Sequence, residues 1–255
     1  MTPVSGLKVA PVKRDLLIVA VLAAIGIAAG EIFVLTVAPF PTQGAEEAEH
    51  IDGAYVTLAV MAAPVVAVVF AALGYSVLRW RTRGRPTGDG AHVMTHGPTV
   101  AAWLLATTAL TGAVIVHPGI TGMLKLHPGD REPIDMVVKV ESFRWMWRIT
   151  YPEQGVTTTT ELVLPVDKRV RFDVMSHDVL HAFWVPAFRM KIDAVPGRVT
   201  TVYATPNRLG GPQDGYSYKL QCAELCGLGH GVMHIPVRVV DEQAFAAWVA
   251  QRAAK

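Results

Sequence analysis

Potential metal ligands crowd into one short segment near the end of the chain, QCAELCGLGHGVMHIPV. They are Cys222, Glu224, Cys226, His230 and Met233. Thiolate, imidazole and thioether groups form a soft ligand set, which suits copper better than a hard cation. The flanking segments read as strands, so the array is expected in a loop that is held at both ends. This pattern predicts a copper site.

The presence of two cysteines in one loop favours a binuclear copper site over a mononuclear one. A mononuclear blue-copper loop carries a single Cys with a His and a weak Met, whereas two thiolates can bridge two copper ions. A binuclear site needs a second imidazole, and His181 in SHDVLHAFWVP lies in the expected region. The two ions could then share one unpaired electron, so that electron transfer would need little ligand rearrangement.

Two other interpretations of the cysteines compete with copper. A disulfide between Cys222 and Cys226 would suit a domain on the outer side of a membrane, but a four-residue spacing in a short loop constrains its geometry. Zinc is the main chemical rival, although zinc sites seldom recruit Met and usually use CxxC spacing. The joint occurrence of thiolates, imidazole and thioether favours copper.

Short strands are expected to position these residues. The segments MVVKVESFRWMWRITY, TTTTELVLPV, RVRFDVM, HAFWVP, RVTTVYA, YSYKLQ and IPVRVV alternate with turn residues, which predicts a β-sandwich or barrel. The final segment DEQAFAAWVAQRAA predicts an amphipathic helix, with Asp241 as its N-cap and with Phe245 and Trp248 on its apolar face.

The first half of the chain has a different character, since long uncharged runs fill it. The segments from roughly Leu16 to Phe40, Ala54 to Trp80, and Val100 to about Lys125 each exceed the ~20 apolar residues that a bilayer core requires. The chain is therefore expected to contain three parts. Residues 1–53 form an N-terminal span and an acidic outer loop, and residues 54–126 form a transmembrane hairpin with a basic cytoplasmic loop. Residues 127–255 form the outer β domain.

The charges that flank these spans agree on one topology. The first span is preceded by the basic residues Lys8, Lys13 and Arg14. It is followed by the acidic residues Glu46, Glu47, Glu49 and Asp52. The second span is followed by the arginines Arg79, Arg81, Arg83 and Arg85. The positive-inside rule then places the β domain on the periplasmic or outer side of a bacterial inner membrane. A net charge of +2, with no basic cluster among aromatic residues, excludes a nucleic-acid binder.

The first apolar segment has a second interpretation, a cleaved signal peptide, which would leave two spans instead of three. Its length exceeds the usual core of about 7–15 residues, and no clear AxA site follows, so a retained span is expected. Glu31 lies inside it, and an intramembrane carboxylate is a functional candidate. Its place toward the outer interface also suits snorkelling or a bond to a neighbouring subunit.

The motifs SHDVLHAFWVPAFRMKIDAVPGR, QCAELCGLGHGVMHIPV and RWMW resemble subunit II of the haem-copper cytochrome c oxidases, over about Ala54 to Val240. The resemblance implies two or three transmembrane helices followed by a cupredoxin-like domain with a binuclear copper A centre. The implied ligands are His181, Cys222, Cys226 and His230, with Met233 as a weak axial ligand and the backbone carbonyl of Glu224. The Glu224 carboxylate would help to bind magnesium at the interface with the catalytic subunit.

The same resemblance implies roles for three further residues. Trp145 matches the position where cytochrome c delivers its electron, and Asp178 and Asp193 match family positions, with Asp178 expected behind the copper ligands. Trp147 is expected in the core. The implied function is electron entry into a proton-translocating terminal oxidase of the respiratory chain: electrons pass from cytochrome c to copper A and on to haem in subunit I, where oxygen is reduced to water.

This sequence departs from the family pattern in three places. Val100 in THGPTVAAW replaces a Glu associated with proton entry, His234 replaces a frequent Pro, and YSYKLQC carries one extra residue. From Pro128 onward, the chain contains 15 Lys and Arg and 14 Asp and Glu, so its composition indicates no strongly acidic docking surface. This balance predicts an electron donor that is held by apolar contact or is tethered to the complex.

Two other functions fit the same residues. A copper A subunit of a nitric oxide reductase would differ only in its partner. A membrane-tethered copper-binding or thiol-redox assembly factor would bind one copper or none. A nitrous oxide reductase domain and a quinol oxidase subunit are disfavoured, the first by the spans and the second by the copper ligands.

Overall fold

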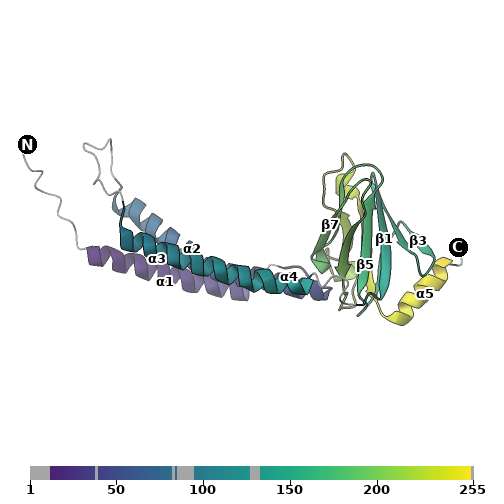
Figure 1. Cartoon of the computed structure of the whole chain (residues 1–255), viewed down its shortest axis with the longest axis horizontal. Coiled ribbons are helices and arrows are strands. Elements are labelled where there is room, and N and C mark those ends of the chain that lie inside the picture. The colour runs from purple at the N-terminus through teal and green to yellow at the C-terminus, as the bar shows by residue number, and fades with distance from the viewer. Residues whose placement is uncertain (1–11, 38–39, 82–83, 85–94, 127–132, 254–255) are drawn as a thin grey trace, which may run out of the picture. The chain divides into compact units, whose positions relative to one another are not determined.

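The structure is a computed structural model that describes residues 12–37, 40–81, 84, 95–126 and 133–253. Two compact units alternate along the chain. The first contains Met1–Ala38 and Ala54–Thr121, and the second contains Pro39–Gly53 and Gly122–Lys255. The predicted fold class, long apolar helices followed by a cupredoxin-like β-sandwich and a C-terminal helix, is confirmed (Figure 1).

Among the described residues, three helices are long and apolar enough to cross a membrane. They are α1 (Val12–Thr36), α2 (Glu46–Arg79), and α3 (Gly97–Val114) with its continuation through Ile115–Ile120 into α4 (Thr121–Leu126). The third helix is interrupted at His117, which has non-helical φ and ψ of −138° and 122°. The following Pro118 explains this interruption, because a residue that precedes proline is pushed out of the helical region.

The acidic segment that was expected as an outer loop is helical in the structure. Glu46, Glu47 and Glu49 lie in the first turn of α2. Carboxylates at a helix N-terminus interact favourably with the helix dipole and with unpaired backbone N–H groups, which explains the early start of α2. Lys8, Arg83 and Arg85, used above in the topology argument, lie outside the described residues.

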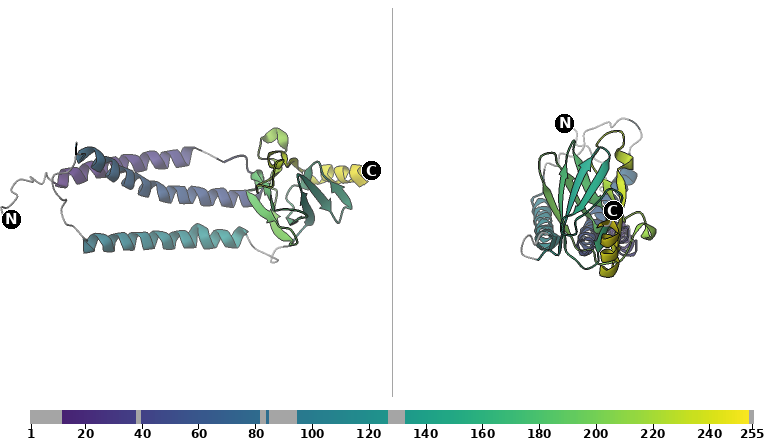
Figure 2. Two further views of the ribbon diagram at one scale, coloured as in Figure 1. Left: turned by 90° about the horizontal axis from the view of Figure 1, so that it is seen from above. Right: turned by 90° about the vertical axis from the view of Figure 1, so that its right-hand side faces the viewer.

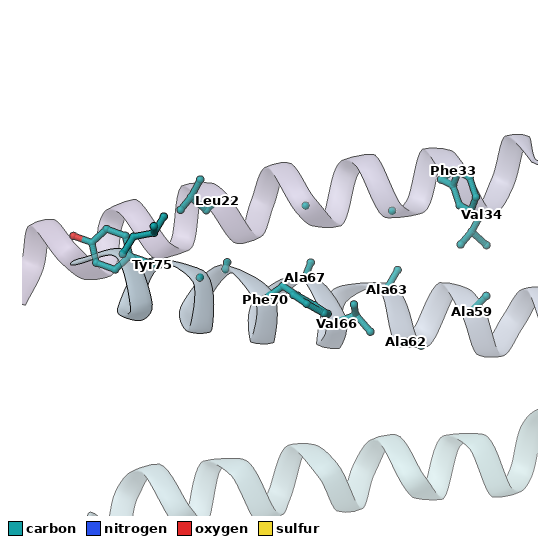
Figure 3. A pocket seen from close by; sticks show the side chains of 15 residues that line it. Leu22, Phe33, Val34, Ala59, Ala62, Ala63, Val66, Ala67, Phe70 and Tyr75 are labelled. Atoms are coloured by element: carbon teal, nitrogen blue, oxygen red, sulfur yellow. The ribbon is translucent and has the colours of Figure 1, made fainter. Parts of the chain in front are cut away.

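Helices α1 and α2 pack through small residues. A Cβ atom added at Gly26 would lie 3.1 Å from the Cβ of Ala67, and one at Gly30 would lie 3.3 Å from that of Ala63. Such small-xxx-small contacts let helix backbones approach closely in a membrane. An apolar groove of about 700 Å³ runs between the two helices (Figure 3).

A polar contact joins the same two helices at another point. The hydroxyl of Tyr75 donates to Oδ1 of Asp15 at 2.5 Å, and Nε of Arg79 lies 3.8 Å from the same oxygen. The small-residue contact and this polar contact make α1 a packed partner of α2.

In the part of the second unit that the structure describes, the strands form two five-stranded sheets, ordered β3-β2-β1-β5-β8 and β4-β10-β9-β6-β7 (Figures 1 and 2). The strands are β1 (Met136–Phe143), β2 (Met146–Tyr151), β3 (Val156–Thr158), β4 (Leu162–Pro165), β5 (Val170–Ser176), β6 (His181–Val185), β7 (Met190–Ala194), β8 (Thr200–Ala204), β9 (Lys219–Cys222) and β10 (His234–Val240). Strands β1 and β5, and β4 and β10, pair in parallel. Alternate side chains form one core, with Trp147, Phe172 and Phe183 fully buried.

Two details of this sandwich differ from the prediction. The run from Met136 to Tyr151 is a hairpin, because the chain reverses at Arg144 and Trp145. That turn contains no Gly, Asn, Asp or Pro, the residues that signal a hairpin in a sequence. Strand β7 was not expected because Lys191 and Asp193 interrupt its apolar residues.

The C-terminal helix α5 (Glu242–Ala253) closes one end of the sandwich. Oδ1 of Asp241 accepts a hydrogen bond from the backbone N–H of Ala244 at 2.7 Å, which confirms the predicted N-cap. Phe245 and Trp248 are buried, as the apolar face required. The carboxylate of Glu161 accepts hydrogen bonds from this helix, from Trp248 at 2.8 Å and from Arg252 at 2.7 Å.

A buried ion pair joins the N-terminal part of α2 to the sandwich. The guanidinium of Arg189 donates two hydrogen bonds of 2.8 Å to the carboxylate of Asp52. It also donates to the carbonyls of Pro41 and Pro186 at 2.7 and 2.6 Å. Arg189 has a positive φ of 56°, which is uncommon for a residue other than Gly.

Candidate metal centre

Neighbouring strands bring the predicted copper ligands together, although these ligands lie far apart in the sequence. His181 begins β6 and Cys222 ends β9, and these two strands pair in register at Phe183 and Cys222. The backbone N–H of Cys222 donates to the carbonyl of Met233 at 3.0 Å. The ligand loop is therefore closed at its base by strand pairing, as the sequence predicted.

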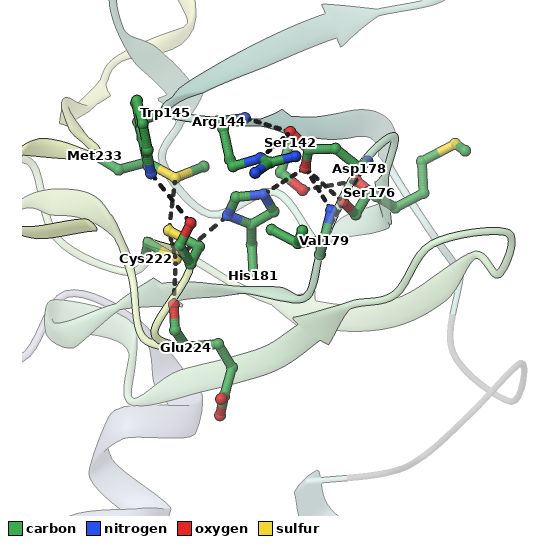
Figure 4. Close-up of polar contacts among 12 residues, drawn as sticks. Ser142, Arg144, Trp145, Ser176, Asp178, Val179, His181, Cys222, Glu224 and Met233 are labelled. Atoms are coloured by element: carbon green, nitrogen blue, oxygen red, sulfur yellow. Dashed lines mark hydrogen bonds and ion pairs between the residues drawn. The ribbon is translucent and has the colours of Figure 1, made fainter. Parts of the chain in front are cut away.

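Four ligand atoms follow one another through the site. Nδ1 of His181 lies 3.7 Å from Sγ of Cys222 (Figure 4). The two Sγ atoms lie 3.8 Å apart, and Sγ of Cys226 lies 3.6 Å from Nδ1 of His230. The ligand atoms of His181, Cys222 and Cys226 all lie within 4.8 Å of one another. The two cysteine sulfur atoms are therefore central, with one imidazole beyond each of them.

The two groups predicted as weaker ligands lie next to the cysteine sulfur atoms. Sδ of Met233 is 3.9 Å from Sγ of Cys226, and the carbonyl oxygen of Glu224 is 3.2 Å from Sγ of Cys222. The carboxylate of Glu224 points away from the cluster (Figure 4). The donor set of thiolates, imidazoles, thioether and carbonyl therefore fits copper.

The cysteines are free thiols and do not form the alternative disulfide. Their Sγ separation of 3.8 Å is far longer than the about 2.05 Å of an S–S bond. Burial, together with the hydrogen bond to Cys222, raises the pKa of the Cys226 thiol to about 11. A metal must therefore displace a proton from this thiol when it binds.

Asp178 supports the His181 side of the site. Its Oδ1 lies 2.8 Å from Nε2 of His181, which is fully buried. Its Oδ2 accepts a hydrogen bond from the backbone N–H of Arg144 at 2.7 Å. Desolvation alone would raise the pKa of Asp178, but hydrogen bonds from His181 and from the backbone of Val179 and Arg144 hold it well below its usual value. Asp178 is therefore a carboxylate that orients the buried imidazole.

The two tryptophans of the RWMW run have different environments. Trp145 is 41% exposed, and its Nε1 donates to the carbonyl of Cys226 at 3.2 Å. Trp147 is fully buried, and its Nε1 donates to the carbonyl of Met233 at 3.4 Å. Trp147 is therefore a core residue, while Trp145 links the surface to the ligand loop.

Other residues singled out in the sequence are not members of this cluster. Asp193 is exposed on β7, where its backbone carbonyl accepts a hydrogen bond from Thr200 at 2.6 Å. Val100 lies in the first turn of α3, within the helical unit. The roles of Asp193 and Glu31 remain predictions.

Sequence comparison identifies the family. A sequence model described as cytochrome c oxidase subunit II, periplasmic domain, matches residues 153–240. A haem-copper oxidase subunit 2 from Aeropyrum pernix is 32% identical over 203 residues, covering 75% of this chain and 83% of that protein. The chain belongs to the subunit II family of the haem-copper cytochrome c oxidases.

Other relatives carry the same family name. A cytochrome c oxidase subunit 2 from Thermostichus vulcanus is 28% identical over 268 aligned positions, covering 84% of this chain and 78% of that protein. The crystal structure of the periplasmic domain of subunit II from Bradyrhizobium japonicum is 32% identical and covers 48% of this chain and 96% of that domain, with a TM-score of 0.45. As a subunit II, the chain combines apolar anchor helices with a copper-compatible His/Cys/Cys site in a periplasmic domain.

Two features of the site were not evident from the sequence. Gly229 lies directly against the Trp145 indole, and Arg144 links the β1–β2 turn to Asp178. Both contacts join loops that are far apart in the chain. A strand alternation pattern contains no information on such loop contacts.

Proposed function

We propose that this subunit II accepts electrons one at a time from cytochrome c at a binuclear copper A centre and passes them to haem in a catalytic subunit that reduces oxygen to water. The chain itself performs no oxygen chemistry. It is proposed to lie in a bacterial inner membrane, with its copper domain on the periplasmic side and with subunit I and further oxidase subunits as partners.

The order His181, Cys222, Cys226, His230 in space is the observation that carries this proposal. Two central thiolates with a terminal imidazole on each side provide bridging and terminal ligands for two ions, whereas one ion would leave part of the set unused. When bound, the copper pair would supply a one-electron redox couple. The protein holds the ligands in a closed loop and fixes His181 through Asp178, so little rearrangement is needed when an electron arrives.

Electron entry at Trp145 is supported by its two-sided position. One part of the indole reaches solvent, and its N–H contacts the backbone of a copper ligand. The same ligand loop exposes apolar side chains, with Leu225 84% and Leu228 99% accessible. An electron donor with an apolar contact face could dock here and place its cofactor near the indole.

The Glu224 carboxylate is proposed to bind magnesium at the interface with the catalytic subunit. Its backbone carbonyl faces Cys222, while its side chain extends to the other side of the loop. Magnesium typically takes one or two carboxylates from a protein and completes its shell with other oxygen ligands. The two duties of this residue therefore use different atoms.

The decisive experiment is copper analysis of the full-length chain, purified in detergent and reconstituted with copper. The expected result is two coppers per chain and an EPR spectrum of one electron shared by two copper nuclei. A Cys226→Ser variant should lose that spectrum. One copper per chain with a mononuclear spectrum would support a copper-binding assembly factor instead.

Purification of the intact complex separates the oxidase from a nitric oxide reductase. The oxidase proposal expects a haem-copper catalytic subunit and consumption of oxygen with reduced cytochrome c. A complex that consumes nitric oxide and leaves oxygen unused would contradict it.

A further inference from the structure

We infer that Gly229 is a positioning residue that lets the Trp145 indole lie flat against the ligand loop, where it can receive an electron from the donor. This inference rests on the proposed role of Trp145 in electron entry. It adds a residue that binds neither metal nor donor and that acts only through the position of the indole.

The contact between Gly229 and Trp145 leaves no room for a side chain. A Cβ atom added at Gly229 would lie 2.5 Å from Cδ2, 2.6 Å from Cγ and 2.8 Å from Cε3 of the Trp145 indole. These distances are far below the ~3.5 Å at which two carbon atoms pack. The indole therefore occupies the space that a side chain at position 229 would need.

The backbone at Gly229 does not itself require a glycine. Its φ and ψ are −91° and 13°, which other residues also adopt. Gly227 differs, because its φ of +112° favours glycine for conformational reasons, and a Cβ there would lie 3.4 Å or more from the indole. An alanine at position 229 would thus test the space beside Trp145 without straining the loop backbone.

The indole, and not the loop, is the part that would move to relieve the contact. Turn hydrogen bonds hold the loop on both sides of Gly229, from the N–H of His230 to the carbonyl of Gly227 at 3.1 Å and from the N–H of Val232 to the carbonyl of Gly229 at 3.2 Å. The Trp145 side chain is partly exposed and can turn outward into solvent. That rotation would break the hydrogen bond from its Nε1 to the Cys226 carbonyl.

The test compares Gly229→Ala with Gly231→Ala in the purified oxidase complex. Gly231 lies in the same loop on the other side of His230, and no described atom lies within 4 Å of an added Cβ there. We expect Gly229→Ala to slow the reduction of copper by reduced cytochrome c by roughly tenfold and Gly231→Ala by less than about twofold, since misplacing a reacting group by about 1 Å can cost up to ~100-fold in rate.

A second readout follows the indole directly. With 5-fluorotryptophan incorporated, the ¹⁹F resonance of Trp145, assigned through Trp145→Phe, should shift in Gly229→Ala and stay in place in Gly231→Ala. The copper EPR spectrum should remain unchanged in both variants. A changed EPR spectrum in Gly229→Ala would overturn the inference, because the ligand loop would then have yielded instead of the indole.

A Trp145→Ala background distinguishes failure of this inference from failure of the proposed entry role. If Trp145→Ala slows reduction and Gly229→Ala does not, the positioning role of Gly229 is wrong. If Trp145→Ala leaves the rate unchanged, the entry role of Trp145 is wrong and the inference falls with it. If both roles hold, Gly229→Ala should cause no further slowing in the Trp145→Ala background.

Discussion

Nε2 of His181 lies 2.8 Å from Oδ1 of Asp178, while Nδ1 of the same ring faces Sγ of Cys222 at 3.7 Å. This arrangement sets the tautomer of the imidazole. The proton lies on Nε2, where the carboxylate accepts it, and the lone pair on Nδ1 is left for a metal.

Asp178→Asn should weaken copper binding by about 10- to 100-fold, because a partner of this kind raises the basicity of the ligand and fixes its orientation. Competition with a copper chelator, followed by the visible absorption of the loaded protein, measures the change. Asp173→Asn is a suitable control, since Asp173 pairs with Arg171 on β5. Equal affinities for Asp178→Asn and the parent chain would remove Asp178 from the site.

Donor binding should depend mainly on apolar contact and only weakly on salt. Two arginines of the β1–β2 hairpin, which carries Trp145, are paired within the chain, Arg144 with Asp178 at 3.5 Å and Arg148 with Glu141 at 3.7 Å. Screening by salt should therefore change the reduction rate little. A steep fall in rate with rising ionic strength would contradict this expectation.

Leu228→Ser tests the same surface by removing an apolar group that is 99% exposed. It should weaken donor binding by roughly fivefold, about 1 kcal/mol, and leave the copper spectrum unchanged. The KM for cytochrome c measures the effect. Leu209→Ser, at an exposed leucine of another loop, should leave KM unchanged.

Glu224→Gln should separate the two duties proposed for this residue. The backbone carbonyl toward Cys222 remains, so the copper EPR spectrum should be unchanged. The carboxylate is lost, so the intact complex should bind manganese, used as a spectroscopic substitute for magnesium, more weakly at the subunit interface. Loss of copper with retained manganese would reverse this assignment.

Glu161 should stabilise the β domain in a pH-dependent manner. Desolvation would raise its pKa, but hydrogen bonds from Trp248, Arg238 and Arg252 lower it below its ordinary value. A lowered folded-state pKa contributes stability above the unfolded pKa, and this stability is lost as the pH falls through the folded value. Glu161→Gln should therefore cost about 1 kcal/mol at pH 7, allowing for partial solvent screening.

Thermal unfolding in detergent at pH 7 and at pH 3.5 measures this difference. The deficit of Glu161→Gln should shrink at the lower pH. Glu153→Gln, at an exposed position in a turn of the same domain, is the matched control. A deficit that is independent of pH would mean that shape and not charge matters at position 161.

Helix α1 should remain in the mature protein as a third span. Its contacts with α2, through Gly26 and Gly30 and through Asp15 with Tyr75, are those of a packed transmembrane helix. Mass spectrometry of the purified subunit should recover peptides from α1. A mature chain that begins after Thr36 would contradict this prediction.

Residue types and spacing were enough to predict a metal-compatible cysteine loop and the three apolar helices. Soft ligands in one loop define a metal class by their chemistry, and a span is defined by length and hydropathy. Both properties are local, so they can be read without knowing the fold. His181 was a candidate from the sequence, but its contact with the loop is not a local property, because it requires β6 to lie beside β9.

The features that the sequence did not reveal depend on tertiary contacts. The turn at Arg144 and Trp145 contains no turn-forming residue, and the Trp145 indole lies against Gly229 from a distant loop. Strand β7 contains two charged residues, because its solvent-facing positions accept them. The pattern of residues in a single sequence indicates burial and secondary structure. The turn, the Trp145–Gly229 contact and strand β7 depend instead on which segments contact each other in the fold.

The Arg189–Asp52 pair has a practical consequence for anyone who wants the copper domain as a soluble fragment. Asp52 lies near the start of α2 and Arg189 lies in the β domain, so the domain is assembled from two separate stretches of chain. A fragment that begins after the last span would leave the largely buried Arg189 guanidinium without its carboxylate, at a cost of about 3–5 kcal/mol. Joining residues 40–53 to such a fragment through a flexible linker should restore the missing carboxylate.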